Sequence, residues 1–362
     1  MKQQFFLSSA KRTIRPGVSL PYLFVFLFMP VLFSCSKSNV TNTTPPPPPV
    51  VDVYVSGTQG DGLFTSSVAM YWKNGVPVML SANTTTERSC AITVSGSDIY
   101  VVGTASFNPD SSLIKYWKNG TPVYIQDPSC FATGIAVSGS DVYVSGTWAN
   151  ASSEKAKYWK NGVAVDLSDG TTTAYANAIT VVGNDVYVAG SESSGTNNSV
   201  AKYWKNGVPV ILSDGTKSES ANAITVSGQD IYVSGSASDP QLTNGISIAK
   251  YWKNGVPVNL SDGSKNANAT SISISGTDVY VAGNEMNSSN IWIAKYWKNG
   301  NPVNLTDGSN QSNANSIAVN ASEVYVAGNA GTASCYWLNN KLFDLSQGTT
   351  DKRANCVFLV KQ

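Results

Sequence analysis

Residues 221–261 read ANAITVSGQDIYVSGSASDPQLTNGISIAKYWKNGVPVNLS, and four short candidate strands follow one another in this stretch. We place the first at 221–227, the second at 231–235, the third at 248–253 and the fourth at 256–260. Asn254-Gly255 joins the last two. An Asn-Gly pair between apolar runs is a strong hairpin signal, because both central residues of a type I′ turn have positive φ. The stretch therefore predicts one unit of four antiparallel strands.

The same unit recurs along the chain. The tetrad Tyr-Trp-Lys-Asn occurs six times, and a seventh, degenerate copy reads Tyr336-Trp337-Leu338-Asn339. Four strands in each of a series of similar units is typical of the blades of a β-propeller. Adjacent Tyr and Trp residues point to opposite faces of a strand, so we expect them to fill the gaps between neighbouring blades. Successive copies are 40 to 48 residues apart, and their Trp residues are Trp72, Trp117, Trp159, Trp204, Trp252, Trp297 and Trp337.

The two ends of the chain share one repeat. The first repeat begins at its second strand, near Val51, while residues 354–360 align with a first strand. We expect the C-terminal strand to complete the first blade and so remove an exposed sheet edge. The sequence therefore predicts an all-β fold, a seven-bladed β-propeller of four-stranded antiparallel blades over residues 51–362, with its ring closed by that strand. A linear solenoid is the alternative, but it gives no reason to divide one repeat between the two ends.

The repeats resemble those of the kelch-type propeller across residues 51–360. Their second strand ends in one Gly, such as Gly235, where kelch repeats have two, and Tyr and Trp are adjacent in the third strand. The chain is also similar to repeat lipoproteins of Bacteroidetes-type bacteria that carry Tyr-Trp-Lys-Asn-Gly units. That resemblance implies a surface or periplasmic location and no defined activity.

Residues 1–34 have the features of a signal peptide, because basic residues precede an apolar run at 18–33. The run ends in Leu32-Phe33-Ser34-Cys35, which resembles a bacterial lipobox and predicts lipidation of Cys35. Ordinary secretion with an incidental Cys is the alternative. Residues 35–50 contain Pro45–Pro49, which predict a stiff polyproline spacer. We expect an exported protein at the outer membrane or cell surface, attached to the membrane through the lipid anchor only.

Composition excludes several classes of function. The chain has no His, which removes His-based catalytic triads and His-ligated metal sites, and 24 basic against 23 acidic residues give no nucleic-acid footprint. One Asp per Asp-Gly pair, as at Asp214, fits a turn better than a calcium site. The four cysteines after Cys35 match no metal motif, and we expect small buried side chains. We therefore expect no metal, no cofactor and no nucleic-acid partner, and we expect a monomer.

Candidate ligand-binding residues lie where the repeats differ from one another. Nearly all length variation falls between the second and third strands, in loops that we place on one face. Phe107, Trp148 and Trp292 lie in or beside these loops, where aromatic rings can stack on sugar faces. For both tryptophans, additional packing beneath a loop is the alternative.

A second candidate set is a ring of polar residues where the first strand of each repeat begins. Such residues could hold a ligand at the mouth of a central channel, but hydrogen bonds to the backbone of neighbouring blades are the interpretation we favour. Four members carry amides: Asn177, Asn222, Asn315 and Asn355.

These features predict a cell-envelope lipoprotein that presents one propeller face to a glycan or a protein. The alternatives are a periplasmic scaffold or assembly lipoprotein and, less favoured, a carboxylate-based glycan enzyme. Only two Arg residues follow residue 34, too few for a sialidase-type Arg triad, and Glu87, Asp127 and Glu192 fall in predicted loops without a motif. We therefore expect no enzymatic activity.

Overall fold

The computed structural model describes residues 51–60, 66–82, 86–108, 111–150, 153–195, 198–238, 245–349 and 351–362. The chain divides into two compact units, and the second, Pro49–Gln362, contains all of these residues. The predicted signal peptide, the lipidation residue Cys35 and the spacer lie outside the described residues. The described residues form strands and no helix, so they include no helix that could span a membrane.

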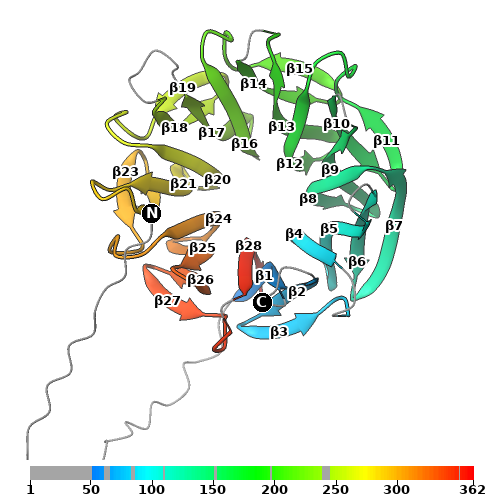
Figure 1. Cartoon of the computed structure of the whole chain (residues 1–362), viewed down its shortest axis with the longest axis horizontal. Helices are drawn as coiled ribbons and strands as arrows, with labels where there is room; N and C mark the ends of the chain where they lie inside the picture. The colour runs from blue at the N-terminus through cyan, green and yellow to red at the C-terminus, as the bar shows by residue number, and fades with distance from the viewer. Residues whose placement is uncertain are drawn as a thin grey trace, which may run out of the picture. The chain divides into compact units, whose positions relative to one another are not determined.

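Five sheets each contain four consecutive strands, and each strand pairs antiparallel with the next. Figure 1 shows these sheets arranged around a common centre, with the first strand of each sheet innermost and the fourth outermost. The strands are β8 (Cys130–Ser138), β9 (Asp141–Ala149), β10 (Glu154–Lys160) and β11 (Val163–Asp166); β12 (Ala174–Val182), β13 (Asp185–Ser193), β14 (Ser199–Lys205) and β15 (Val208–Ile211); β16 (Ser218–Ser227), β17 (Asp230–Ser238), β18 (Ser247–Lys253) and β19 (Val256–Asn259); β20 (Ala267–Ser275), β21 (Asp278–Met286), β22 (Trp292–Lys298) and β23 (Asn301–Asn304); β24 (Ser312–Asn320), β25 (Glu323–Ala330), β26 (Ala333–Leu338) and β27 (Lys341–Asp344).

The sixth sheet has eight strands and is mixed rather than purely antiparallel, which differs from the prediction. It consists of two antiparallel groups of four strands, β28-β1-β2-β3 and β4-β5-β6-β7, joined through a single parallel residue pair, Ser67 with Thr86. Its strands are β1 (Val51–Gly60), β2 (Ser67–Lys73), β3 (Val76–Met79), β4 (Thr86–Ser95), β5 (Asp98–Asn108), β6 (Ser111–Lys118), β7 (Thr121–Pro128) and β28 (Lys352–Lys361).

The last strand of the chain pairs with the first. Strand β28 runs antiparallel to β1 with Val357 opposite Val55, so the C-terminal segment supplies the fourth strand of the group that contains β1. This pairing was predicted from the repeat that the two ends share. Together with the repeated four-stranded sheets, it is the arrangement of a propeller-like fold.

The Asn-Gly turns have the predicted geometry. Asn254 and Gly255 have φ of 50° and 82°, as a type I′ turn requires. The Asn254 side chain also links strands, because its Nδ2 donates to Asp230 Oδ1 at 2.7 Å and its Oδ1 accepts from the backbone N–H of Ile231 at 2.8 Å. Lys253 pairs with the same carboxylate at 2.8 Å, so Lys253 and Asn254 hold the pKa of Asp230 below its ordinary value. Among the described residues this Asp–Lys pair occurs six times, as Asp52–Lys73, Asp98–Lys118, Asp141–Lys160, Asp185–Lys205, Asp230–Lys253 and Asp278–Lys298.

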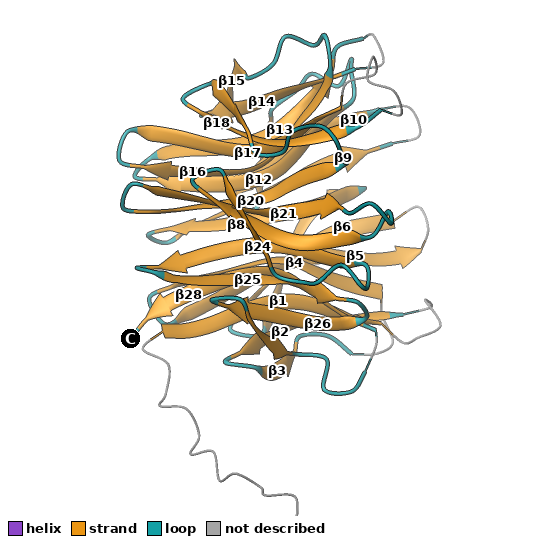
Figure 2. Ribbon diagram, turned by 90° about the vertical axis from the view of Figure 1, so that its left-hand side faces the viewer, coloured by secondary structure: helices purple, strands orange, loops and turns teal. Residues whose placement is uncertain are grey.

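The repeated aromatic residues form the core between sheets, as predicted. Trp204 is 1% exposed and packs against the preceding sheet, while Tyr203 packs against the following sheet and Trp252. In Figure 2 the turns between first and second strands lie at one end of the sheets, and the second strands pass toward the third at the other end. The Asp–Lys–Asn network therefore lies at the opposite end from the connections that vary in length.

Candidate ligand-binding site

The ring of amides is used in hydrogen bonds between sheets. A β-bulge between Ala221 and Ala223 leaves Asn222 unpaired within its own sheet, so its side chain is directed out of the ladder. Its Nδ2 donates to the carbonyl oxygen of Ala269 in the next sheet at 2.8 Å. Strand β16 begins at Ser218, so the residue lies within the strand rather than at its predicted start. The other three amides make the same bond, Asn177 to Ala221 at 2.9 Å, Asn315 to Ala354 at 2.8 Å and Asn355 to Ser89 at 2.7 Å.

Two hydroxyls take the same role, and one thiol differs. Thr133 donates to the carbonyl oxygen of Ala176 at 2.7 Å, and Thr270 donates to that of Ala314 at 2.8 Å. At the equivalent position Cys90 donates to the carbonyl oxygen of Val102 within its own sheet, at 3.4 Å. The junction between β4–β7 and the sheet β8–β11 thus departs from the repeated pattern.

Both candidate tryptophans lie in strands. Trp148 in β9 lies opposite Cys130 and Lys155, and its half-buried side chain packs against a core cluster that includes Trp159. Trp292 is the first residue of β22 and is also half-buried. The ladders include both residues, since Trp148 pairs with Lys155 and Trp292 pairs with Met286. Phe107 lies in β5, and its side chain is outside the described part of the structure.

Sequence reasoning missed a set of buried or partly buried lysines in the third strands. The residue before the Tyr of each tetrad is a Lys in five repeats, and each of these lysines lies beside a Trp ring and a carboxylate. Lys250 Nζ, for example, is 5.4 Å from the Trp252 ring centroid and 3.0 Å from Glu219. The pairs are Lys115–Glu87, Lys157–Asp127, Lys202–Glu192, Lys250–Glu219 and Lys295–Glu285.

These ion pairs explain carboxylates that the sequence left without partners. Glu87 lies in β4, Asp127 in β7 and Glu192 in β13, not in loops. The side chains of Lys115 and Glu87 are only 7% and 5% exposed, at an N–O distance of 2.9 Å. A buried charge is costly unless it is paired, so each buried Lys needs a carboxylate nearby.

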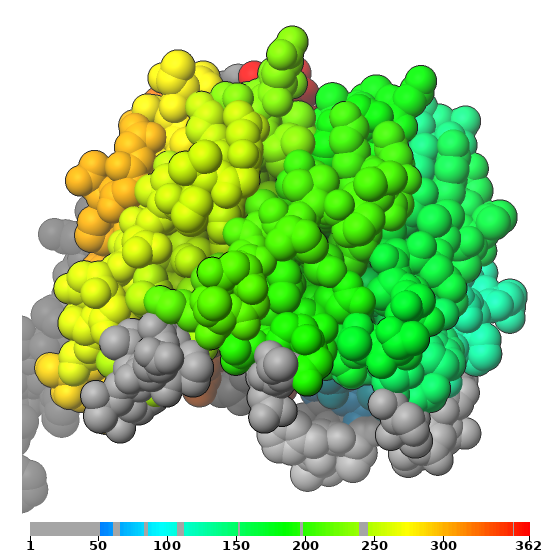
Figure 3. Space-filling model, turned by 90° about the horizontal axis from the view of Figure 1, so that it is seen from above, coloured from blue at the N-terminus to red at the C-terminus, as the bar shows by residue number. Residues whose placement is uncertain are grey.

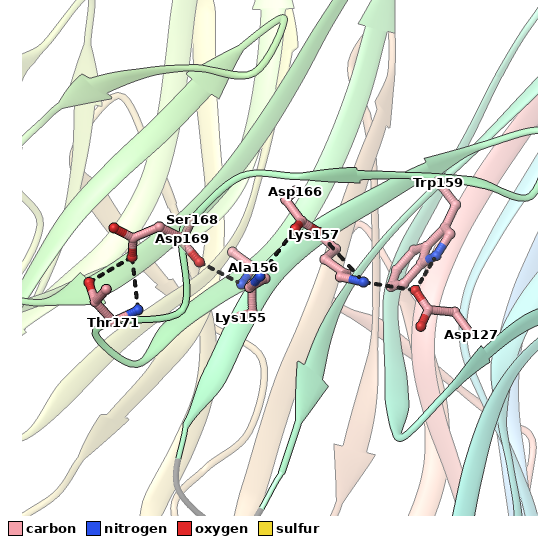
Figure 4. A network of polar contacts seen from close by, with 9 residues as sticks. All are labelled: Asp127, Lys155, Ala156, Lys157, Trp159, Asp166, Ser168, Asp169 and Thr171. Atoms are coloured by element: carbon pink, nitrogen blue, oxygen red, sulfur yellow. Dashed lines mark hydrogen bonds and ion pairs between the residues drawn. The ribbon is translucent and has the colours of Figure 1, made fainter.

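One of these carboxylates comes from the neighbouring sheet (Figure 4). Asp127 Oδ2 accepts from Lys157 Nζ at 2.9 Å and from Trp159 Nε1 at 3.1 Å, so β7 is tied to β10. Asp166 lies 3.5 Å from Lys157 on the other side. Burial acts to lower the pKa of Lys157, but the hydrogen bond to Asp127 and the two negative charges outweigh it, so the pKa lies above its ordinary value.

The junction between β12–β15 and β16–β19 has a cleft in the equivalent place. Asp214 occupies the position of Asp127, but its Oδ1 accepts from the N–H and hydroxyl of Thr216 at 2.9 and 2.7 Å. The cleft has a volume of about 490 Å³ and lies on the side of the unit coloured green to yellow in Figure 3. Its lining residues are Ile211, Leu212, Ser213, Asp214, Thr216, Lys217, Glu219, Lys250, Trp252 and Pro257.

The lining combines apolar surface with charged groups. Ile211 is 56% exposed and Pro257 is also exposed, while the side chains of Lys250 and Glu219 are 11% and 10% exposed. Apolar surface beside a few fixed polar groups is what a sugar requires, since its ring face is apolar and its hydroxyls donate and accept hydrogen bonds. The cleft presents both kinds of group side by side.

The Asp-Gly pairs form turns, as predicted. Asp169 accepts from the N–H of Thr171 at 2.8 Å, and Asp262 and Asp307 accept in the same way from Ser264 and Ser309. Within the described ranges no three His, Cys, Asp or Glu side chains are grouped so as to hold a metal ion.

No protein-family model matches the chain, and no curated protein matches it. Among solved structures it is similar to a puromycin-hydrolyzing peptidase of Mycobacterium tuberculosis, with 11% identity, a TM-score of 0.51, and coverage of 80% of this chain and 50% of that one. It is also similar to the acylaminoacyl peptidase of Pyrococcus horikoshii, with 10% identity, a TM-score of 0.51, and coverage of 82% and 50%. TolB from Acinetobacter baumannii has 12% identity, a TM-score of 0.46, and coverage of 70% and 64%.

The chain spans about half the length of the two peptidases. At 10% to 11% identity these likenesses show a propeller-like fold alone.

The expectation that the chain has no enzymatic activity is contradicted. Two solved structures that share its fold are peptidases, so this architecture occurs in hydrolases. That expectation rested on too few Arg residues and no His, which removes particular site chemistries but not hydrolysis as a class.

Proposed function

We propose that the chain is a lipid-anchored cell-envelope protein whose seven-bladed β-propeller is a binding module for a glycan. The cleft between β15 and the sheet β16–β19 is the observation that carries the proposal. It joins exposed apolar surface at Ile211 to the charged pair Lys250–Glu219, and it lies beside a connection between repeats.

Seven blades follow if the mixed sheet is counted as two blades. Its two groups of four strands meet only at the Ser67–Thr86 pair, and five further sheets have four strands each. Closure of the ring is supported on both sides of β28. Asn315 reaches β28 from the sheet β24–β27 at Ala354, and Asn355 reaches from β28 to Ser89 in β4.

The proposed location rests on the sequence alone. The lipobox-like Leu32-Phe33-Ser34-Cys35 and the proline run would place the propeller a short distance from the membrane. Replacing Cys35 with Ser should release the protein from the membrane fraction, and external protease should degrade the wild-type protein on intact cells. Protection from protease until the outer membrane is opened would place the protein in the periplasm instead.

A glycan array with the purified propeller tests the proposed function. The best-bound glycan is then titrated by calorimetry against the wild type, Ile211→Lys and Val208→Lys. Both residues are exposed on β15, but only Ile211 lines the cleft. We expect Ile211→Lys to weaken binding at least tenfold and Val208→Lys to leave it unchanged. Equal affinities for the two variants, or no glycan bound on the array, would contradict the proposal, and time-dependent cleavage of the bound glycan would make the site catalytic.

A further inference from the structure

One position of the innermost strands is exposed or partly exposed in every copy, and its residue changes from copy to copy. It lies one residue before the residue that pairs with the glycine of the second strand, as Arg88 does before Ser89, which pairs with Gly103. Thr104, opposite Arg88, lies toward the end of β5, so this inner position is at the end of the sheets where second strands pass toward third strands (Figure 2). The occupants, in the order of their strands around the centre of Figure 1, are Arg353 in β28, Arg88 in β4, Phe131 in β8, Tyr175 in β12, Ser220 in β16, Asn268 in β20 and Asn313 in β24.

Two neighbouring strands carry Arg at the inner position. Arg353 and Arg88 are the only arginines after residue 34, and both are exposed. Their strands are tied together beside them, because Asn355 Nδ2 in β28 donates to the carbonyl oxygen of Ser89 in β4 at 2.7 Å. Asn355 follows closely after Arg353 in the chain, and Ser89 follows Arg88 directly. The two arginines therefore lie side by side on adjacent strands.

Side chains at equivalent positions of neighbouring innermost strands can meet. Further along the same two strand types, Ser316 Oγ in β24 lies 3.7 Å from Cys356 Sγ at the equivalent position of β28. An Arg side chain is longer than Ser or Cys, so the guanidiniums of Arg353 and Arg88 can reach a common group. A guanidinium forms two parallel hydrogen bonds to a carboxylate, which suits this pair to an acidic ligand.

The positive charge at the two arginines is not neutralised within the described ranges. Neither Arg88 nor Arg353 forms an ion pair there, and neither does Asp351, an exposed acid near Arg353 in the chain. Lys352 is 6% exposed and has no carboxylate partner among the described residues, unlike Lys250, which pairs with Glu219. Since a buried charge is costly without a partner, an external anion is favoured here.

The next two innermost strands add aromatic surface. Phe131 in β8 is 47% exposed and Tyr175 in β12 is 38% exposed. The Tyr175 hydroxyl donates to the carboxylate of Glu154 in β10, which holds this ring between two sheets. Arg and aromatic residues are enriched in protein–protein interfaces and supply much of their binding energy. The remaining inner positions carry only Ser or Asn, so charge and aromatic surface are gathered on four successive strands.

We propose that Arg88, Arg353, Phe131 and Tyr175 form a docking site for a partner protein, through a segment in which an acidic residue stands next to an apolar one. The carboxylate binds the two guanidiniums, and the apolar side chain covers the exposed Phe131 ring. The site shares no residue with the glycan cleft and goes beyond the proposed glycan binding.

The direction of β1 favours a partner protein over the membrane of the predicted anchor. Strand β1 begins at Val51, opposite Lys361, and passes Arg353 only at Thr58. The chain therefore enters the sheet at the opposite end from the arginines. An anchor that precedes Val51 would be joined to that opposite end.

The test selects peptides from a phage library of random sequences on the purified wild-type protein. We expect the selected peptides to share Asp or Glu next to a large apolar residue. The best peptide is then titrated by fluorescence anisotropy against the wild type, Arg88→Gln/Arg353→Gln and Lys265→Gln/Lys361→Gln. Both variants lose two exposed basic residues, so their net charge is equal. The Arg variant should lose at least about tenfold in affinity, and the Lys variant should bind as the wild type does.

The aromatic part is tested on the same peptide. Phe131→Asn introduces the residue that occupies the inner position of β20 and should weaken binding by about fivefold. Asn268→Ala, on the polar side, should leave the affinity unchanged, and thermal unfolding confirms that each variant is folded. No selected peptide, or equal losses in the Arg and Lys variants, would overturn the proposal. An oligogalacturonate that binds the wild type more tightly than every selected peptide and is lost in the Arg variant would also overturn it, in favour of an acidic glycan.

Discussion

Two junctions between sheets place the same residue in opposite roles. Asp127, at the end of β7, reaches across to Lys157 and Trp159 in the next sheet. Asp214, after β15, turns back to Thr216 and leaves a cleft of about 490 Å³ in front of Lys250. The two Asp residues occupy the same position in the repeat, so the local sequence around each Asp decides the outcome. We call the junction that Asp127 bridges closed and the junction with the cleft open.

The residue after each Asp explains the difference. Gly215 has φ of 77°, a conformation that suits Gly and lets the chain fold back on Asp214. Pro128 cannot adopt a positive φ, so β7 stays extended for eight residues and carries Asp127 forward. Lys250 then takes its carboxylate from Glu219 in the first strand of its own sheet. The lysine of the third strand needs a carboxylate partner in each of these sheets, but the strand that supplies the carboxylate differs.

The largest expected effect comes from removing the partner at the open junction. Glu219→Ala leaves Lys250 buried without its carboxylate and should destabilise the fold by about 3 kcal/mol. Asp214→Ala, in the exposed turn nearby, should cost under about 1 kcal/mol, since it loses only local hydrogen bonds. Urea unfolding of both variants measures this, and equal costs would mean that the buried pair has no special role.

The closed junction should tolerate the loss of its carboxylate better. Asp127→Ala should cost about 2 kcal/mol, because Asp166 remains 3.5 Å from Lys157. Asp127→Asn keeps an acceptor for Trp159 and should cost about half as much. If Asp127→Ala instead costs more than Glu219→Ala in the same urea assay, Asp166 does not compensate.

An additional amide in the ring should stabilise the fold at the closed junction. Cys90 stands where Asn222 donates to the next sheet, so Cys90→Asn should bond to the carbonyl oxygen of Ala132 and stabilise the fold by about 0.5 kcal/mol. The matched loss, Asn222→Ala, should cost about 1 kcal/mol. Thermal unfolding of the two variants shows whether each substitution raises or lowers stability. A lower stability in both would mean that the site of Cys90 has no room for the amide.

The exposed Asp–Lys pairs should give the smallest effect. Because the pKa of Asp230 is lowered in the folded chain, its ionised form contributes stability above the unfolded pKa of 3.8, and this is lost as the pH falls through the folded pKa. Asp230→Asn should therefore flatten the acid side of the stability profile slightly, while Glu219→Gln should lower stability at neutral pH. Urea midpoints measured between pH 2.5 and 7 separate the two effects. If stability falls with acid as steeply in Asp230→Asn as in the wild type, the Asp230–Lys253 pair does not contribute to stability.

The features that recur in every repeat could be predicted from the sequence. The strands, the Asn254-Gly255 turn and the alternating packing of Tyr203 and Trp204 follow from spacing and residue type, because every copy meets the same need. The ladder between β16 and β17 continues past the bulge at Asn222 as far as Ser218, which the strand pattern does not encode.

The buried ion pairs could not be predicted in the same way. Their carboxylates come from a first strand at Glu87, a second strand at Glu192 and a fourth strand at Asp127, so no fixed spacing relates them to their lysines. The only available signal was a Lys two residues before a buried Trp. The cleft could not be predicted either, because it depends on whether the Asp214 side chain bonds to Thr216 or to the next sheet.

A crystal structure of the propeller with the best-bound glycan tests most directly whether the open junction binds the ligand. We expect a sugar ring in the cleft, against Ile211 and within hydrogen-bond distance of Glu219 or Lys250. A sugar found at the junction closed by Asp127, or anywhere outside the cleft, would contradict it.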